Sequence, residues 1–470
     1  MAHLYDFENR GGLTKYEFLY QSLKEDILSG RLRLGSKLPS KRAIAQENGI
    51  SVRTVMQAYE QLVMEGYVQP KERSGYFVVS NFHNKKSDQN VPYLPVTPEF
   101  EPKWLVDFAS NSAVVEKFPF TLWVRAIKGA ISQYGRNLIR RGDFLGSKAL
   151  RREVSSYLIR TRDVVANPDC LVIASSIEYL YSRLISLLPK NFIYAVETPG
   201  YRKIPRIFED IGVQWACVDM DEEGISISSL EASGANVVHV SPEHHYPLGT
   251  VMSLKRRQEL LEWLHARPNR FIIEDDYDCE FRYRGKSIPA LAGLDAEHRV
   301  IYMNTFSKTM SPGIRISYML MPERLIERYV QTTNFFSNSS SNLDQHALAL
   351  FIHDGYFERH VNRLRKYFRT QGGLLMDAIE RCPELPVEKI AGIETGTHLL
   401  VKLRTELSDE EIAWEASRRK IHLSMLSEFC LKDKKRYEHV LVLNFPTLCA
   451  EGIEKAVREL SLVFQSQRSV

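Results

Sequence analysis

Cysteine is scarce in this sequence, long apolar runs are missing, and neither sign of charge dominates. The six cysteines are scattered along 470 residues without a Cys-x-x-Cys pair, which is typical of reduced thiols and not of a disulfide framework. No stretch of about 18 uncharged apolar residues occurs, so we expect no membrane-spanning helix. The first residues lack the basic and apolar regions of a signal peptide, and a cytoplasmic protein is therefore predicted.

The overall composition is that of a folded protein with more than one domain. Hydrophobic residues make up 44% of the chain and charged residues 26%, and at roughly 150 residues per domain about three domains are expected. The net charge of +4 is small for this length. It neither requires nor excludes a polyanionic partner, so an argument for nucleic-acid binding has to come from local pattern.

Residues 12–80 carry the pattern of a winged helix-turn-helix domain. Apolar residues at helical spacing, the capping residues Ser40 and Ser51, and glycine turns between the segments predict three helices and a hairpin. Two short helices around a glycine turn, followed by a hairpin, is the arrangement of this DNA-binding module. The expected elements are helices over 16–28, 41–47 and 52–65, and strands over 67–69 and 75–79.

The third of these helices would enter the major groove of DNA with its N-terminal side chains forward. Arg53, Thr54 and Gln57 fall on its solvent face, where they can reach base edges or phosphates. Ser51 at the helix N-terminus suits a phosphate. The alternative is a helical interaction domain with solvated basic residues, because acidic residues are interleaved with them. Further basic residues would hold the DNA backbone from either side: Lys41, Arg42, Lys71 and Arg73.

Residues 81–103 have no amphipathic period and are polar early and proline-bearing late. They indicate an interdomain linker that could extend to about 60–70 Å. An ordered strap that docks on its own domain through Tyr93, Leu94, Phe100 and Trp104 is the alternative, and the sequence leaves both open.

From residue 104 onward, short β-rich runs alternate with helical patterns. The alternation predicts an α/β fold with a doubly wound, mostly parallel sheet, which binds ligands at the carboxyl ends of its strands. A smaller C-terminal α+β lobe is expected from about 350 to 470. The strand-like segments are 170–174, 192–196, 214–218, 237–240, 270–274 and 300–303.

Lys308 lies in the run TFSKTMSPGIR, residues 305–315. Two hydroxyl residues flank the lysine, a Pro-Gly turn follows, and Arg315 comes seven residues on. These are the groups that a protein needs to hold pyridoxal 5'-phosphate (PLP) as a Schiff base. The amine attacks the aldehyde, while hydroxyls and a guanidinium take the phosphate.

Other polar motifs follow the predicted strands. Ser176 leads into a helix whose free N–H groups, that of Ile177 included, make an anion site. Tyr201 could stack on a pyridine ring, although a buried structural tyrosine is the alternative. His244 or Tyr246 could meet the ring hydroxyl.

The acidic run 274–278 ends another predicted strand. Strand alternation puts Asp275 and Tyr277 on one face, so Asp275 is chosen for the pyridine nitrogen and Tyr277 for the ring oxygen. An acidic metal cluster is the alternative, but it lacks a histidine at useful spacing, and no metal site is predicted.

Residues 15–79 resemble the GntR family of bacterial transcription regulators, and the motifs around 176, 201, 275 and 308 together resemble fold type I aminotransferases. Joined by a linker, the two resemble the MocR subfamily of GntR regulators over almost the whole chain. The resemblance implies that Lys308 carries PLP, and that Thr305, Ser307, Arg315, Ser176 and the Ile177 amide hold its phosphate. It also implies a homodimer that binds operator DNA and senses an amine, an amino acid or PLP, and it leaves open whether the two subunits are domain-swapped.

One departure from the aminotransferase pattern bears on function. Those enzymes clamp a substrate carboxylate with an arginine of the C-terminal lobe, but Glu428 stands in the stretch where this arginine is expected. Arg404 or Arg436 are alternative candidates. We therefore expect a regulator with at most half-transamination. The alternatives are an active aminotransferase with a fused DNA-binding domain, and a regulator of vitamin B6 synthesis with PLP as effector.

Overall fold

The computed structural model describes residues 5–80, 104–111, 113–283 and 288–465. The chain divides into two compact units, Met1–Glu101 and Pro102–Val470, which are treated separately below. The predicted linker, 81–103, lies outside the described residues. None of the helices within the described ranges is long and apolar enough to cross a membrane.

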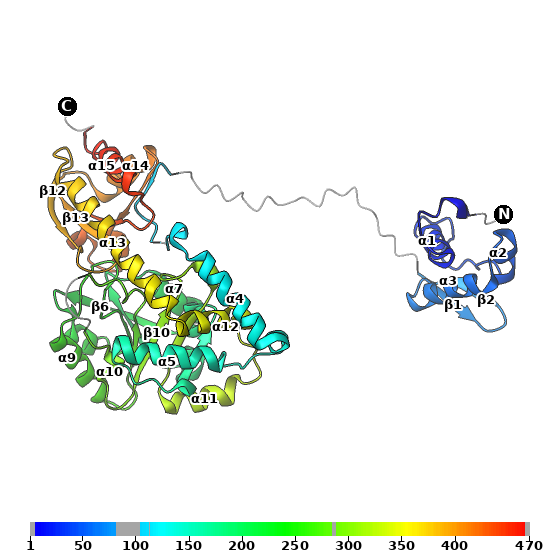
Figure 1. The fold of residues 1–470 in the computed structure, drawn as a ribbon, viewed down its shortest axis with the longest axis horizontal. Coiled ribbons are helices and arrows are strands. Elements are labelled where there is room, and N and C mark those ends of the chain that lie inside the picture. Colours follow the sequence, from blue (N-terminus) through cyan, green and yellow to red (C-terminus); the bar gives the residue numbers. More distant parts are fainter. Residues whose placement is uncertain (1–4, 81–103, 112, 284–287, 466–470) are drawn as a thin grey trace. The chain divides into compact units, whose positions relative to one another are not determined.

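The first unit is a winged helix-turn-helix, as the sequence predicts (Figure 1). Ser40 and Ser51 each cap a helix by accepting a hydrogen bond from a main-chain N–H three residues on. The two strands form an antiparallel hairpin in which Val68 pairs with Val78. The elements are α1 (Lys15–Leu28), α2 (Lys41–Glu47), α3 (Val52–Met64), β1 (Val68–Lys71) and β2 (Gly75–Val78).

The apolar faces of α1 and α3 form the core of this unit. Leu19, Leu23 and Ile27 of α1 and Val55 and Leu62 of α3 are fully buried, which is the helical spacing the sequence shows. A short helix that the sequence did not indicate, η1 (Phe7–Asn9), precedes α1. It is held by a ring contact from Phe7 to Phe18 and a 2.8 Å hydrogen bond from the Tyr5 hydroxyl to Asp26.

The second unit is built on an eight-stranded sheet in the order β4-β11-β10-β9-β8-β5-β6-β7. Strands β10, β9, β8, β5 and β6 are parallel to one another, while β11 pairs antiparallel with both β10 and β4, and β7 pairs antiparallel with β6. All six predicted strands are present. The bounds are β4 (Leu171–Ala174), β5 (Ile193–Thr198), β6 (Gln214–Asp221), β7 (Gly224–Ile225), β8 (Val237–Val240), β9 (Phe271–Asp275), β10 (Val300–Thr305) and β11 (Ser317–Leu320).

Helices cover both faces of this sheet, because alternate strand residues point to opposite sides. Leu171 and Ile173 of β4 pack in one core with α4, α5 and α12. Val172 and Ala174 of the same strand pack in a second core with α6, α7 and α11. The helices are α4 (Phe120–Tyr134), α5 (Lys148–Arg162), α6 (Ile177–Leu187), α7 (Lys203–Ile211), α8 (Ile227–Ala232), α9 (Leu254–His265), α10 (Leu291–Leu294), α11 (Glu323–Thr333) and α12 (Asn342–His353).

A smaller α+β lobe follows, as predicted. Its four-stranded antiparallel sheet has the order β12-β13-β16-β15 and packs against α13 and α15. The first strand of the unit, β3 (Val106–Asp107), also belongs to this lobe, because it pairs with β14 (Ile421–His422). The remaining elements are β12 (Val387–Ala391), β13 (His398–Leu403), β15 (Ser424–Met425), β16 (Val440–Asn444), α13 (Tyr356–Glu380), α14 (Asp409–Arg418) and α15 (Ile453–Ser461).

Candidate functional site

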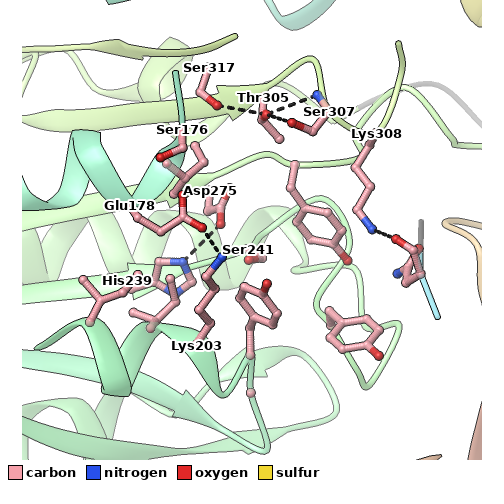
Figure 2. A pocket seen from close by; sticks show the side chains of 18 of the residues that line it. Ser176, Glu178, Lys203, His239, Ser241, Asp275, Thr305, Ser307, Lys308 and Ser317 are labelled. Carbon is pink, nitrogen blue, oxygen red and sulfur yellow. Dashed lines mark hydrogen bonds and ion pairs between the residues drawn. The ribbon is translucent and has the colours of Figure 1, made fainter. Parts of the chain in front are cut away.

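The carboxyl ends of the parallel strands open onto a cavity of about 630 Å³. Residues that follow β4, β5, β8, β9 and β10 line it, together with residues of the C-terminal lobe. This is where an open parallel sheet binds its ligands. The predicted cofactor residues that line the cavity are Ser176, Ile177, Tyr201, Asp275, Tyr277, Thr305, Ser307, Lys308 and Arg315 (Figure 2).

Lys308 follows β10 on a loop, and its side chain extends into the cavity. Its amine donates a hydrogen bond to the main-chain carbonyl of Asn111. Burial lowers the pKa of the Lys308 amine to about 8, against the opposing charge of Asp278. About one tenth of the amine is therefore unprotonated at pH 7, far more than for an ordinary lysine, and this is the form that attacks a carbonyl carbon.

A set of hydroxyl groups lies at one end of the cavity. Thr305 donates a 3.0 Å hydrogen bond to the Ser307 hydroxyl and accepts one of 2.9 Å from Ser317, as Figure 2 shows. Arg315 also lines the cavity, and its φ of 53° lies in the left-handed region that few non-glycine residues adopt. Ser176 caps α6, whose N-terminal N–H groups carry a partial positive charge. These groups suit a phosphate.

Asp275 ends β9 and is nearly fully buried. Its Oδ2 lies 3.5 Å from Nε2 of His239, and its Oδ1 has no hydrogen-bond partner among the described residues. An unsatisfied buried carboxylate oxygen that faces a cavity is costly, so it points to a ligand with an N–H group.

The neighbouring carboxylate has a structural role instead. Asp276 accepts hydrogen bonds of 2.8 Å from Arg162 and 2.6 Å from the Tyr302 hydroxyl. In the described part of the chain, no three or more His, Cys, Asp or Glu side chains gather so as to hold a metal.

His244 is not among the described residues that line the cavity, whereas Tyr246 is. The His244 Nδ1 lies 2.7 Å from Asp278 Oδ2 and 3.2 Å from the Tyr277 hydroxyl. The histidine therefore orients Tyr277 from behind. Tyr201 is 48% exposed and makes an edge contact with Tyr246, so its ring stands at the cavity wall.

A second buried pair lies on the cavity wall. His245 Nε2 is 3.4 Å from Glu197 Oε2, and both side chains are buried. Burial raises the pKa of Glu197 to about 8, with Asp275 adding to the effect and the Ser241 N–H opposing it. Burial also lowers the pKa of His245 to about 3. Both groups are therefore uncharged at neutral pH.

Several lining residues were not selected from the sequence. His239 could have been found, because it is the one polar residue in the buried strand β8. Glu197, Ser241 and His245 follow the predicted strands 192–196 and 237–240, so their place after a strand could also have marked them. The others have no such local signal, and the tertiary fold brings them to the cavity. They are Asn111, Glu178, Lys203, Ser317, His422, Ser424 and Phe429.

The wall formed by the C-terminal lobe contains no arginine among the described lining residues. Arg404, Arg436 and Glu428 do not line the cavity. His422 takes a place there, stacked on Trp104 at 4.8 Å and 9°, with its Nδ1 3.0 Å from Asp107. A bidentate clamp for an α-carboxylate is thus missing from this described wall.

The candidate DNA surface of the first unit is formed by α2, the start of α3 and the hairpin. Arg42, Ser51, Arg53 and Gln57 are exposed. Thr54 is half-buried instead, and its hydroxyl lies 2.8 Å from that of Ser51 in the helix cap.

The remaining basic side chains of this surface belong to the helix-turn-helix and the wing. The Lys41 amine contacts the Tyr76 hydroxyl at 3.4 Å, while Lys71 and Arg73 are exposed at the hairpin tip. Cations on both sides of α3 are what a phosphate backbone requires.

PLP fits the cavity residues. A phosphate would meet the hydroxyl groups, the α6 N-terminus and Arg315, and the pyridine N–H would meet the unpaired Asp275 oxygen. The amine of Lys308 would reach the aldehyde. When bound, PLP supplies a carbonyl that condenses with amines and a ring that withdraws electrons.

Family comparisons match both units. Residues 15–78 match the model for bacterial regulatory proteins of the gntR family, and residues 104–436 match the model for aminotransferases of class I and II. Among solved structures, kynurenine aminotransferase from Pyrococcus horikoshii is similar with a TM-score of 0.69 and 22% identity, covering 79% of this chain and 93% of that one. This likeness concerns the fold.

Relatives match over nearly the full length. The chain is 36% identical to the HTH-type transcriptional regulator YdeL of Bacillus subtilis, with 96% of each chain covered. It is 27% identical to the probable rhizopine catabolism regulatory protein MocR of Rhizobium meliloti, over 85% of this chain and 83% of that one. It is also 27% identical to the pyridoxine biosynthesis transcriptional regulator PdxR of Corynebacterium glutamicum, over 82% of each.

The family matches, the relatives and the cavity agree on one architecture. The N-terminal gntR-type domain binds DNA, and the aminotransferase-type domain binds PLP. The chain therefore belongs to the MocR-type transcriptional regulators of the GntR family, which join a winged helix-turn-helix to an aminotransferase-like domain.

Proposed function

We propose that this regulator uses the cavity as a sensor, in which Lys308 holds PLP and an amine effector competes with Lys308 for it. The observation that carries the proposal is Lys308 itself: a half-buried lysine with a pKa of about 8, in the same cavity as an Asp275 oxygen that has no partner among the described residues. Perturbed groups that converge in one cavity mark a functional site. The sequence and the relatives add the DNA-binding unit through which a sensor can act on transcription.

Each cavity residue has a proposed task. Thr305, Ser307, Ser176, the Ile177 amide and Arg315 bind the phosphate, and Tyr201 packs on the ring. Asp275 keeps a proton on the ring nitrogen, because an ionised carboxylate stabilises a neighbouring N–H⁺. Tyr277, oriented by His244, donates a hydrogen bond to the ring oxygen.

The signal would leave the cavity through the segment 104–111, which continues directly from the linker residues. Asn111 accepts a hydrogen bond from Lys308 through its carbonyl and one of 2.9 Å from Thr397 through its side chain. When the Lys308 amine changes partner, this segment loses or gains a contact. A ligand shifts such an equilibrium only by its different affinity for the two arrangements.

The effector class follows from the cavity wall. With His422 in place of an arginine among the described lining residues, we propose an amine without an obligatory α-carboxylate, or PLP itself. PdxR is named as a regulator of pyridoxine biosynthesis, which favours PLP as one candidate. An active aminotransferase is the second candidate, since the lysine and Asp275 suffice chemically for transamination.

We propose that the protein acts as a cytoplasmic homodimer on a repeated operator. Support comes from exposed apolar side chains on α4 and just after it, where Phe120 is 63%, Ile131 52% and Ile139 87% exposed. Large apolar side chains that stay exposed in this way are typical of protein interfaces when they gather in one patch. Half-sites spaced by whole helical turns would match a two-fold dimer.

The decisive experiment is footprinting of the upstream region of the gene with full-length protein. The protection pattern is compared with no ligand, with PLP, and with PLP plus a panel of amines and matching amino acids. We expect PLP and an amine to change the pattern, and amino-acid turnover to stop at about one equivalent. Identical footprints in all conditions, or turnover far above one equivalent, would refute the sensor.

A further inference from the structure

A carboxylate stands at the end of the cavity where the phosphate is proposed to bind. Glu178 is the second residue of α6, two residues after the capping residue Ser176, and it lines the cavity. Its Oε1 accepts a hydrogen bond from the amine of Lys203, which is the first residue of α7 (Figure 2). Lys203 also lines the cavity. A negative charge at this place is unexpected, since it repels a phosphate.

The Glu178 carboxylate uses the same donors that a phosphate needs. It lies at the start of α6, where the Ser176 hydroxyl and the main-chain N–H of Glu178 itself stabilise its ionised form. Burial opposes the charge, but the Lys203 ammonium and these two donors lower the pKa of Glu178 to about 2. The carboxylate is therefore ionised at every physiological pH, and it occupies the positive end of the α6 dipole.

The positive charge of Lys203 is balanced by the Glu178 carboxylate in this ion pair. Its side chain is 49% exposed and that of Glu178 is 39% exposed, so both can move without unfolding the core. An ion pair at such exposure contributes little to stability and exchanges partners at low cost.

We propose that Glu178 is an internal anion that competes with the PLP phosphate for the α6 N-terminus, and that Lys203 leaves Glu178 to bind the phosphate when PLP enters. The proposal rests on the sensor function proposed above and explains how binding can stay reversible. A cofactor that must displace a built-in anion binds more weakly, so that occupancy follows the PLP concentration.

The test compares PLP affinity of full-length wild type and Glu178→Gln, measured by tryptophan fluorescence and by absorbance titration. Glu178→Gln is expected to bind PLP about tenfold more tightly, because like-charge repulsion is removed at the same side-chain shape. Pyridoxal, which has no phosphate, should bind both proteins within about twofold. Glu209→Gln, an equal charge change on the exposed face of α7, should leave both affinities unchanged.

Lys203 is tested in two backgrounds. Lys203→Met alone should weaken PLP binding, because Glu178 then faces the phosphate without a counter-charge. In the Glu178→Gln background the same change should again weaken PLP binding and leave pyridoxal binding unaltered, since Lys203 then serves only the phosphate. Circular dichroism checks that each variant is folded.

The outcomes separate this inference from the sensor function. If wild type binds neither PLP nor pyridoxal, the sensor function fails. If wild type binds PLP but Glu178→Gln binds it no more tightly, the internal anion is refuted and the sensor function stands. If Lys203→Met has no effect in the Glu178→Gln background, the transfer of Lys203 to the phosphate is refuted.

Discussion

The amine of Lys308 donates a hydrogen bond to the main-chain carbonyl of Asn111. The contact joins two segments that are 197 residues apart in the sequence. Asn111 is also tied to Thr397, and the strand β3 just before it pairs with β14 of the C-terminal lobe. The lysine proposed to hold PLP is therefore in direct contact with the first described segment of its own domain, which follows the linker residues in the sequence.

Lys308→Ala should abolish covalent attachment of PLP. Wild type mixed with PLP is expected to gain a visible absorbance band that borohydride reduces irreversibly, because the Lys308 amine is the nucleophile in the cavity. The variant should show only the spectrum of free or loosely bound PLP, and mass spectrometry after reduction should find no PLP adduct. Lys190→Ala, at an exposed position outside the cavity, serves as the control.

The reactivity of Lys308 should depend on pH in a defined window. Burial lowers the pKa of its amine to about 8, so the nucleophilic form grows as pH rises through 8. The rate of adduct formation with PLP should rise about tenfold per pH unit below pH 8 and level off above it. Stopped-flow absorbance between pH 6 and 10 measures this. A rate that keeps rising to pH 10 would mean that Lys308 has an ordinary pKa.

Asp275→Asn should slow the exchange of PLP from Lys308 to an added amine by about 100-fold, because the ring nitrogen loses the carboxylate that keeps it protonated. The absorbance maximum of bound PLP should shift as well. His239→Gln is the matched comparison, since it removes the 3.5 Å neighbour of Asp275 but keeps the carboxylate. Its effect should be about tenfold at most. If the two variants slow the exchange equally, the ring nitrogen is kept protonated by Asp275 and His239 together and not by Asp275 alone.

The fold could be predicted from the sequence to the extent that local pattern determines it. Buried parallel strands are short, nearly continuous apolar runs, so β5, β8, β9 and β10 were recognisable. Strand β11 was not, because its four residues follow the Lys308 loop directly and it inserts between β4 and β10. That placement depends on pairing across the sheet, which no local pattern records.

The candidate site likewise contains some residues that the sequence could identify and others that it could not. Residues that follow predicted strands, such as Ser176, Asp275 and Thr305, were identifiable because parallel strand ends meet at one edge of a sheet. Asn111 and His422 come from segments that tertiary packing brings to the cavity. The sequence offered His244 or Tyr246 for the ring hydroxyl. In the structure Tyr246 lines the cavity, whereas His244 does not line it and contacts the Tyr277 hydroxyl.

Glu197→Gln should change how stability depends on pH. The pKa of Glu197 is raised from 4.5 to about 8 in the folded state, so folding takes up a proton between these values. The free energy of unfolding of wild type should therefore fall, relative to the variant, by about 1.4 kcal/mol per pH unit as pH rises through this window. Urea unfolding at pH 6.5 and pH 8 measures the difference, and parallel curves would mean that Glu197 is ionised in the folded protein.

Arg53→Ala should weaken operator binding and relax its sequence preference. Arg53 is exposed on the first turn of α3, the helix expected in the major groove, and a side chain that contacts a base contributes about 1–3 kcal/mol. Affinity for the footprinted operator should fall about tenfold or more, while affinity for random DNA changes less.

Lys71→Gln should act differently from Arg53→Ala, because a phosphate contact is independent of sequence. Its affinity for operator and random DNA should fall together, and the slope of log affinity against log salt should become shallower by about 0.9. Lys24→Gln is the control, since the Lys24 amine is bound to Glu65 beyond the far end of α3, at 2.8 Å. If Lys24→Gln weakens binding as much as Arg53→Ala does, the DNA lies on another face of the domain. Fluorescence anisotropy at several salt concentrations distinguishes the three variants.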